Sequence, residues 1–436
     1  MPARSPHDRE ILRLALPALA TLAAEPTYLL VDTAMVGHLG TRPLAALALA
    51  AAVLGTLAGL GVVVTYATTA AVARLHGGGR HELVHRLAAQ SLWLGVGAGL
   101  LAAAIVVVAG PAWIDLLGGR GATADDAARY LRIAAPGLAC AIVGLAAQGW
   151  LRGTGDLRTP LLLVLLGNAI NVVLNPLLIY GADLGLDGSA IATLTGQLAM
   201  GAGFVAVLWR GSRGTSRRPA ASLLGHLGGT GLLLLVRSAA LLLSFSAASA
   251  IAARIGEPSL AAHQIGWQLF LFLALVLDAI AIAGQVLIGR ALGGGRVDEA
   301  VAAAHRMVGW TVAFGLLAAV VLLLLRGPIV SAFTDAADVR DRAAAMWPLL
   351  CAMLPFAAAV FAFDGILIGA GDARFLAAAM VAAAVVGIPA MVLMRDAGGG
   401  IAGVWGGIVV LIGVRLAGTW WRFAGRRWAR PGAWRG

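Results

Sequence analysis

The stretch GWLRGTGD, residues 149–156, decides the fold because it returns as GILIGAGD at residues 365–372, 216 positions later (365 − 149). The same offset relates GGGR at 77–80 to GGGR at 293–296, and HLG at 38–40 to RIG at 254–256. Each glycine-rich loop alone is a weak signal, but three loops in register at one offset predict an internal repeat. The chain is therefore predicted to consist of two halves with the same layout.

Apolar runs long enough to cross a bilayer, about 20 residues each, recur throughout the chain. Its 436 residues are 60% hydrophobic and 12% charged, whereas a soluble domain is nearer a quarter charged. The alternation typical of an outer-membrane barrel is absent. We predict an all-α polytopic membrane protein with twelve spans, at roughly 11–36, 44–73, 86–110, 127–151, 159–180, 188–209, 228–252, 260–289, 300–325, 342–369, 374–394 and 400–421.

The loops between these spans differ in charge, and arginine-rich loops stay on the cytoplasmic side of a membrane. Acidic residues mark the alternate loops, at Asp115, Asp125, Asp126, Asp183, Asp187, Asp335 and Asp338. Arginines mark the others, at Arg4, Arg9 and Arg13, Arg74, Arg80 and Arg86, Arg152 and Arg158, Arg210, Arg213, Arg217 and Arg218, Arg290 and Arg296, Arg374, and Arg422, Arg426, Arg427, Arg430 and Arg435. We therefore expect both termini in the cytoplasm, with the protein in a bacterial inner membrane.

The longest polar connection, residues 210–227, falls near the middle of the chain. It divides the sequence into an N-lobe over 1–209 and a C-lobe over 228–436. Six spans per lobe is an even number, so both lobes enter the membrane from the same side and form a parallel repeat related by a pseudo-twofold axis. The net charge of +11 lies mostly in short loops, so it indicates topology, and no nucleic-acid partner is expected.

The first span carries acidic groups at membrane depth, in EPTYLLVDTAMVG at 25–37. Glu25, Tyr28 and Asp32 share one helical face, because positions i, i+3 and i+7 lie on the same side of a helix. Ionisable groups at this depth usually face a water-filled cavity and have a function. We interpret this face as the coupling site of a secondary transporter, although a carboxylate that caps a neighbouring helix is the alternative for Asp32.

A second polar row lies on the fifth span, at Asn168, Asn171 and Asn175, just before Pro176. The spacing again places the three amides on one face. Such a row can serve as interhelical hydrogen bonding or as a cavity wall opposite the first span. We favour the cavity wall.

Three charges are predicted to be buried in the C-lobe: Arg237, Asp278 and Asp364. Arg237 and Asp278 lie at similar depths on their spans, which predicts a structural ion pair between them. Asp364 lies about one turn from Gly369. It can gate the inner mouth or accept hydrogen bonds from loop backbone, and we favour the second role.

The string HELVH at 81–85 has the spacing of a zinc site on a helix. An intramembrane metalloprotease would also need a third ligand, and Asp187 in Leu186-Asp187-Gly188 is the candidate. Three predicted spans separate the two motifs, which places them on opposite sides of the membrane. A metal site is therefore not expected, and a metalloprotease remains only a remote alternative.

Four stretches together resemble the multidrug and toxic compound extrusion (MATE) family, in its DinF-like branch. They are PTYLLVDTAMVGHLG at 26–40, GWLRGTGD at 149–156, LDAIAIAGQVLIGRALGGG at 277–295 and FDGILIGAGDAR at 363–374. The resemblance extends over the whole chain and implies a cation-coupled antiporter. It further implies coupling residues at Asp32, Tyr28, Asn171, Asn175 and Thr193. The family pattern has an Asp where this sequence has Asn175, which weakens a Na⁺ site built from charged oxygen ligands.

The resemblance and the residues together predict a monomeric efflux antiporter that uses no cofactor and exports amphipathic, often cationic, drug-like compounds. The predicted coupling ion is H⁺ in preference to Na⁺, and Glu25 and Asn168 are candidates for the substrate cavity. A flippase for lipid-linked precursors, from the same superfamily, is the alternative. It would favour a large basic cavity, whereas few arginines lie within the spans.

Overall fold

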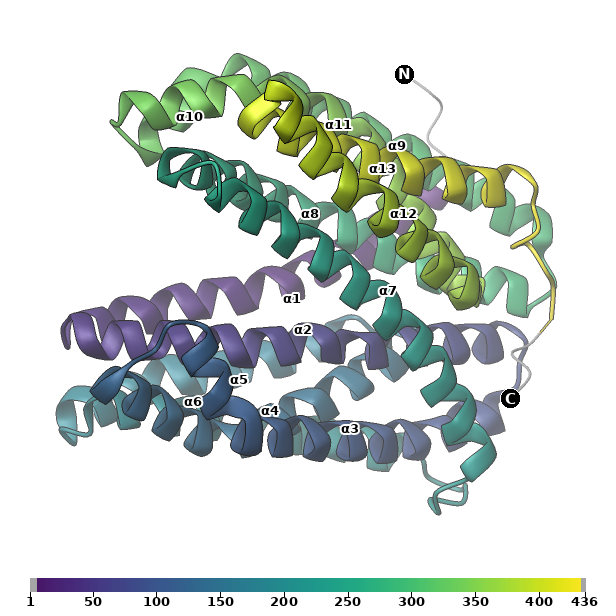
Figure 1. The fold of residues 1–436 in the computed structure, drawn as a ribbon. Helices are drawn as coiled ribbons and strands as arrows, with labels where there is room; N and C mark the ends of the chain where they lie inside the picture. The colour runs from purple at the N-terminus through teal and green to yellow at the C-terminus, as the bar shows by residue number, and fades with distance from the viewer. Residues whose placement is uncertain (1–5, 433–436) are drawn as a thin grey trace. The chain divides into compact units, whose positions relative to one another are not determined.

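The computed structural model describes residues 6–432, which are almost entirely helical and contain no strand (Figure 1). Arg4 and Arg435, two of the arginines predicted to lie on the cytoplasmic side, are outside the described residues. The first half comprises α1 (Pro6–Gly37), α2 (Thr41–Gly77), α3 (His81–Leu116), α4 (Gly121–Gly153), α5 (Arg158–Pro176), the π-helical turn η1 (Leu177–Gly181) and α6 (Gly185–Gly211). The second comprises α7 (Ala221–Ala253), α8 (Glu257–Gly293), α9 (Val297–Leu324), α10 (Arg326–Phe333), α11 (Ala337–Gly369), α12 (Ala373–Met394), the π-helical turn η2 (Arg395–Gly399) and α13 (Gly400–Ala424).

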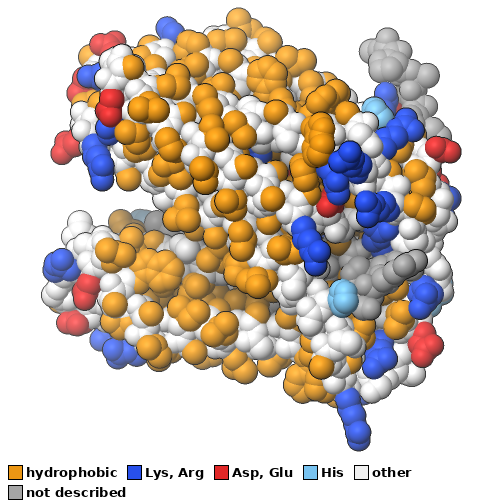
Figure 2. All heavy atoms as spheres, turned by 45° about the vertical axis from the view of Figure 1, so that its right-hand side comes forward, with side chains coloured by type: hydrophobic (Ala, Val, Ile, Leu, Met, Phe, Trp, Pro, Cys, Tyr) orange, Lys and Arg blue, Asp and Glu red, His pale blue; other side chains and the backbone are white. Residues whose placement is uncertain are grey.

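Within the described residues, eleven helical stretches are long and apolar enough to cross a membrane. The last of them, Ala373–Ala424, contains both α12 and α13, so twelve crossings result. The predicted all-α fold with twelve spans is confirmed. Hydrophobic side chains cover the middle of the visible surface, while charged side chains gather at the helix ends (Figure 2). The short helix α10, which joins α9 to α11, was not predicted.

The helix bounds repeat the offset seen in the sequence. α2 and α8 each have 37 residues and begin 216 positions apart (257 − 41), and α4 and α11 each have 33 residues at the same offset (337 − 121). The helix contacts also correspond between the halves. α4 contacts α2, α3 and α6, and α11 contacts their counterparts α8, α9 and α13. The predicted internal repeat is therefore confirmed.

Glycine is needed at matching points of both halves. Gly79 and Gly295 have φ values of 69° and 76°, a left-handed conformation that side chains with a Cβ rarely adopt. Gly149 and Gly365 mark close helix crossings, where an added Cβ would lie 2.6 Å from the Thr65 carbonyl oxygen and 2.4 Å from that of Ala281, respectively. These requirements explain why the glycine-rich motifs recur in register.

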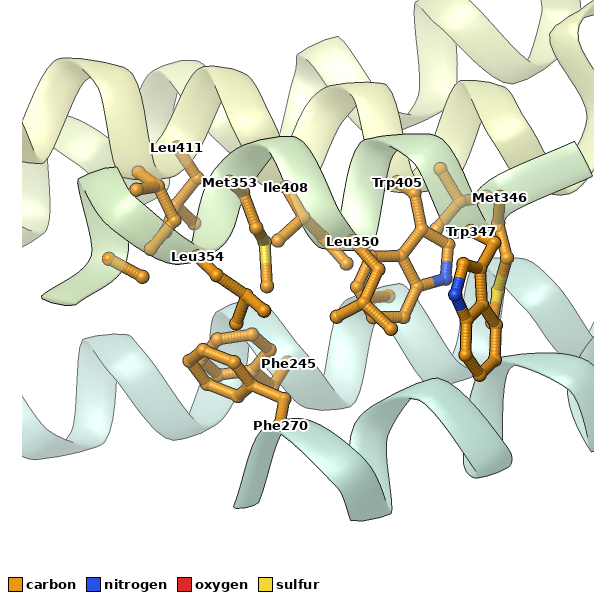
Figure 3. Packing of buried hydrophobic residues seen from close by; sticks show 14 of the residues in the cluster. Phe245, Phe270, Met346, Trp347, Leu350, Met353, Leu354, Trp405, Ile408 and Leu411 are labelled. Atoms are coloured by element: carbon orange, nitrogen blue, oxygen red, sulfur yellow. The ribbon is translucent and has the colours of Figure 1, made fainter. Parts of the chain in front are cut away.

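The chain divides into two compact units. Residues 17–231 form the N-terminal unit, while residues 232–432 together with the described start of α1, up to Leu16, form the C-terminal unit. The C-terminal unit has a core of large apolar side chains on α7, α8, α11 and α13, including Phe245, Phe270, Trp347 and Trp405 (Figure 3). The indole of Trp347 donates to the Leu322 carbonyl at 2.8 Å, which ties α11 to α9.

Candidate functional site

Asp32 lies at the centre of the polar groups in the N-terminal unit. Its side chain is buried on α1, with the residue only 2% exposed. One carboxylate oxygen, Oδ1, accepts hydrogen bonds from Asn175 Nδ2 on α5 at 2.7 Å and from Ser189 Oγ on α6 at 2.8 Å. The acid of the first helix is thus bound by donors from α5, which carries the predicted asparagine row, and from α6, which carries Thr193.

Hydrogen bonds continue from Asp32 into a polar chain, which we define as Asp32, Asn175, Asn171, Thr193 and Tyr130. Asn175 Nδ2 also donates to Asn171 Oδ1 at 3.1 Å, and Asn171 Nδ2 donates to Thr193 Oγ1 at 3.1 Å. The Thr193 hydroxyl lies 3.4 Å from the hydroxyl of Tyr130 on α4. Asn175 Oδ1 is buried without a hydrogen-bond partner among the described residues. The polar chain therefore connects four helices and keeps one acceptor unused.

A cavity of about 100 Å³ lies beside this polar chain and is called here the N-lobe cavity. Its polar lining consists of Glu25, Tyr28, Asp32, Tyr130, Thr193 and Gln197, and the remainder is apolar, from α1, α2 and α4. Two of the lining residues are acidic and none is basic. The cavity therefore suits a proton, a cation or a molecule with a cationic end.

The remaining predicted residues of the N-lobe occupy different positions around this cavity. Glu25 and Tyr28 line it from α1, and Glu25 is exposed whereas Tyr28 is half-buried. Asn168 donates to the Ala24 carbonyl at 3.1 Å and so joins α5 to α1. Asn168 also lines a smaller pocket with Tyr28, Asn171 and Thr193. The structure thus brings every predicted N-lobe residue into one region.

Glycines allow α5 and α6 to approach closely enough for the polar chain to form. A Cβ added at Gly196 would lie 2.6 Å from the Gly167 carbonyl oxygen, and one at Gly167 would lie 3.0 Å from the Gly196 carbonyl oxygen. Asn171 lies one turn from Gly167, and Thr193 lies one turn from Gly196. The crossing therefore sets the distance over which Asn171 reaches Thr193.

Three polar residues at the site were missed from the sequence: Ser189, Tyr130 and Gln197. Ser189 and Gln197 flank Thr193 at intervals of four, so a helical-face argument from Thr193 could have found both. Gln197 Oε1 is buried without a hydrogen-bond partner in the described part of the chain. Tyr130 is one of only four tyrosines in the sequence, but nothing in its local pattern indicates that it faces Thr193.

The buried charges of the C-terminal unit meet at Asp364 on α11. Both Arg237 on α7 and Arg415 on α13 donate to the same carboxylate oxygen, Oδ2. The expectation that Asp364 accepts hydrogen bonds from loop backbone is therefore wrong. Its Oδ2 accepts from the two guanidinium groups, and its Oδ1 has no hydrogen-bond partner among residues 6–432. The pairing of Arg237 with Asp278 stays a prediction. Arg415 was not among the buried charges predicted for the C-lobe.

The HELVH motif does not gather ligands in the structure. His85 Nδ1 lies 2.7 Å from the Gly211 carbonyl oxygen, and His81 packs edge-on against His76. No group of three or more His, Cys, Asp or Glu side chains that could hold a metal occurs in residues 6–432. The motif is thus part of the start of α3.

Known proteins resemble this chain in sequence and fold. The MatE family model matches residues 17–177 and 234–393, one segment in each half. Protein DETOXIFICATION 44, chloroplastic, from Arabidopsis thaliana is 31% identical over 98% of this chain and 83% of its own length. DNA damage-inducible protein F from Escherichia coli is 29% identical over 98% of this chain and 94% of its own. A mutant of the Vibrio cholerae MATE transporter VcmN superposes with a TM-score of 0.87 at 21% identity, covering 96% of both chains.

One matched segment lies in each structural repeat, and together they cover well over half of the chain. The relatives cover nearly all of it, and the solved structure shares its fold. On these grounds the chain belongs to the MATE family, whose members are membrane transporters of small molecules and not enzymes.

Proposed function

We propose that this protein is an efflux antiporter that exchanges H⁺ for amphipathic, often cationic, organic compounds, with Asp32 as the proton-carrying group. The observation that supports the proposal is the placement of Asp32. Its carboxylate is buried, bound by donors from two other helices and adjacent to the N-lobe cavity. An acid in this position responds to both a proton and a nearby cationic ligand, which is the requirement for coupling them.

Proton coupling is favoured over Na⁺ coupling by the ligands around Asp32. Asn175 and Ser189 present an N–H and an O–H toward the carboxylate, so they act as donors and leave no second negative charge beside it. A hard cation prefers several oxygen ligands with negative charge. We infer that Asp32 binds a proton and that Glu25, on the exposed side of the cavity, contacts substrate or water.

The lining of the N-lobe cavity favours a cationic substrate. Glu25 and Asp32 contribute negative charge, the described lining contains no basic side chain, and the rest is mainly Leu, Ala and Gly. An anionic lipid-linked precursor would be repelled by these carboxylates, so the flippase alternative is disfavoured. We propose that the cationic end of an amphipathic compound pairs with the acids while its apolar part contacts the aliphatic lining.

Protonation of Asp32 would rearrange the polar chain. The charged carboxylate accepts from Asn175 and Ser189, whereas a protonated one must also donate. Asn175 Oδ1 is an unused acceptor, and a turn of the Asn175 amide would aim it at the new proton. The Asn171 amide would then turn as well, because its Oδ1 would otherwise face Asn175 Oδ1 in place of Asn175 Nδ2. We infer that protonation reverses the direction of hydrogen bonding along the chain and removes the charge that holds a cationic substrate.

The orientation and assembly of the protein are proposed on the same basis. The arginine-rich loops would lie in the cytoplasm together with both termini, in a bacterial inner membrane. We propose that the monomer is the transporting unit, because each chain carries both repeats. Asn168, which ties α5 to α1, is assigned to the substrate cavity alongside Glu25, and no cofactor takes part.

A transport assay tests the proposal. Purified protein in liposomes, loaded with a lipophilic cationic dye, is exposed separately to a pH gradient and to a Na⁺ gradient. We expect dye movement under the pH gradient and none under the Na⁺ gradient. Asp32→Asn should lose the proton-driven movement while the protein elutes and melts like the parent. Proton-driven transport by a folded Asp32→Asn variant would falsify the assignment.

A further inference from the structure

The segment between α6 and α7 is held against the N-terminal unit. The buried amide of Gln90 on α3 donates to the Arg218 carbonyl at 3.0 Å and accepts from the Ala220 N–H at 2.9 Å. The indole of Trp93 donates to the Arg217 carbonyl at 2.9 Å. These three bonds fix the backbone of residues 217–220 along α3, so the arginines of this segment have defined positions.

A groove opens beside this fixed segment and is called here the interfacial groove. It has a volume of about 400 Å³, and its apolar lining includes Ala89, Leu92 and the indoles of Trp93 and Trp209. Both indoles are about half exposed, at 46% and 53%. Arg217 and Arg218 line the same groove. Tryptophan beside arginine is typical of the level at which a membrane meets the cytoplasm.

The arginines of the groove lack acidic partners. Arg217 lies over the Trp209 ring at 4.0 Å from its centroid and donates to Ser212 Oγ and the Trp209 carbonyl. Among residues 6–432, no carboxylate forms a salt bridge with Arg217 or Arg218. The sequence has no acidic residue between Asp187 and Glu257. The groove therefore carries uncompensated positive charge.

We propose that the interfacial groove binds an anionic phospholipid of the cytoplasmic leaflet. The lipid phosphate would accept hydrogen bonds from the Arg218 guanidinium and the remaining N–H groups of Arg217. An acyl chain would lie along Leu92 and the Trp93 ring. Basic pockets between spanning helices on the cytoplasmic side recognise lipid headgroups in this manner. The inference depends on the membrane orientation proposed above and not on the transport mechanism.

Native mass spectrometry of the full-length protein tests the proposal. Detergent-solubilised protein is incubated with equal amounts of phosphatidylglycerol and phosphatidylcholine, and retained lipids are counted. We expect the parent to retain phosphatidylglycerol preferentially. Arg217→Gln/Arg218→Gln should reduce that preference by about 25-fold, because each arginine near an anionic lipid surface contributes a factor of about five. Arg218→Gln alone should reduce it in part, and this single variant breaks no ion pair within residues 6–432 whose loss could unfold the protein.

The matched control is Arg210→Gln/Arg213→Gln, which removes the same charge from exposed positions outside the groove lining. It should keep the preference. An equal loss in both double variants would show attraction to net charge and would overturn the site. Absence of any phosphatidylglycerol preference in the parent would do the same, as would displacement of the lipid by millimolar inorganic phosphate. Because the readout is bound lipid, failure here leaves the transport proposal untouched.

Discussion

Asn175 on α5 donates a hydrogen bond of 2.7 Å to the carboxylate of Asp32 on α1. The acid of the polar chain is therefore bound by a neutral amide and not by a second acid. This single contact links the two polar rows visible in the sequence. It supports the proposed proton coupling, because a neutral amide adds no negative charge beside Asp32 for a metal cation.

Replacement of Asn175 by Asp should change the ion response. The variant places a second carboxylate beside Asp32 and supplies the charged oxygen ligands that Na⁺ prefers. We expect Asn175→Asp to show dye transport in proteoliposomes under a Na⁺ gradient, and we expect the parent to show none. Asn175→Ala is the control, because it removes the same amide without adding charge and should gain no Na⁺ response. A Na⁺ response of the parent itself would contradict the proton assignment.

Ser189→Ala should weaken transport without unfolding the protein. The variant removes one of two donors to Asp32 Oδ1, and a hydrogen bond to a charged group contributes about 1.5–3 kcal/mol. The equilibrium between the charged and the protonated form of Asp32 would shift about tenfold or more toward the protonated form. The initial transport rate should therefore fall. Ser91→Ala is the matched control, because Ser91 is equally buried but donates to Leu87 within its own helix. Equal effects of both substitutions would remove Ser189 from the site.

The fold was predictable because its signals are local or repeated. Three glycine-rich loops at one offset indicate the two halves, and in the structure they are turns with left-handed glycines. Asp32 was found because Glu25, Tyr28 and Asp32 share one face of a single helix, which the helical period determines. Asn171 and Asn175 were found in the same way on the fifth span.

Contacts between helices were harder to predict, because spacing within one helix does not reveal how the next helix is rotated. Tyr130 meets Thr193 through the rotation of α4 against α6, which no local pattern records. Arg237 donates to Asp364 on α11, a partner that the estimated depths of the two residues on their spans did not indicate. Depth alone cannot choose between acids on different helices, since the choice depends on which faces pack together.

Gly196→Ala should destabilise the N-terminal unit and impair transport. The added methyl group would lie 2.6 Å from the Gly167 carbonyl oxygen, so α5 and α6 must separate. Overpacking of this kind costs about 1–3 kcal/mol, and the Asn171–Thr193 hydrogen bond would lengthen. A lower melting temperature in detergent and slower dye efflux are the expected results. Gly97→Ala is the control, because an added Cβ there meets nothing within 4 Å. Unchanged melting of Gly196→Ala would show that the crossing tolerates a methyl group.

Asp364→Asn should strongly destabilise the C-terminal unit. Arg237 and Arg415 share this carboxylate, and both guanidinium groups are largely buried, with side chains 11% and 4% exposed. Removing one partner of a buried ion pair costs about 3–5 kcal/mol, because the remaining charge stays buried. We expect a large drop in melting temperature, partly restored in Asp364→Asn/Arg415→Gln.

Asp372→Asn is the control for that prediction, because Asp372 pairs with Arg422 at 2.6 Å but both side chains are more exposed, at 15% and 19%. Its loss of stability should be smaller, since water can solvate the arginine that remains. An Asp364→Asn variant that melts like the parent yet fails to transport would contradict the structural role. In that case the carboxylate would act in the transport cycle itself, because stability and activity would then have separated at one residue.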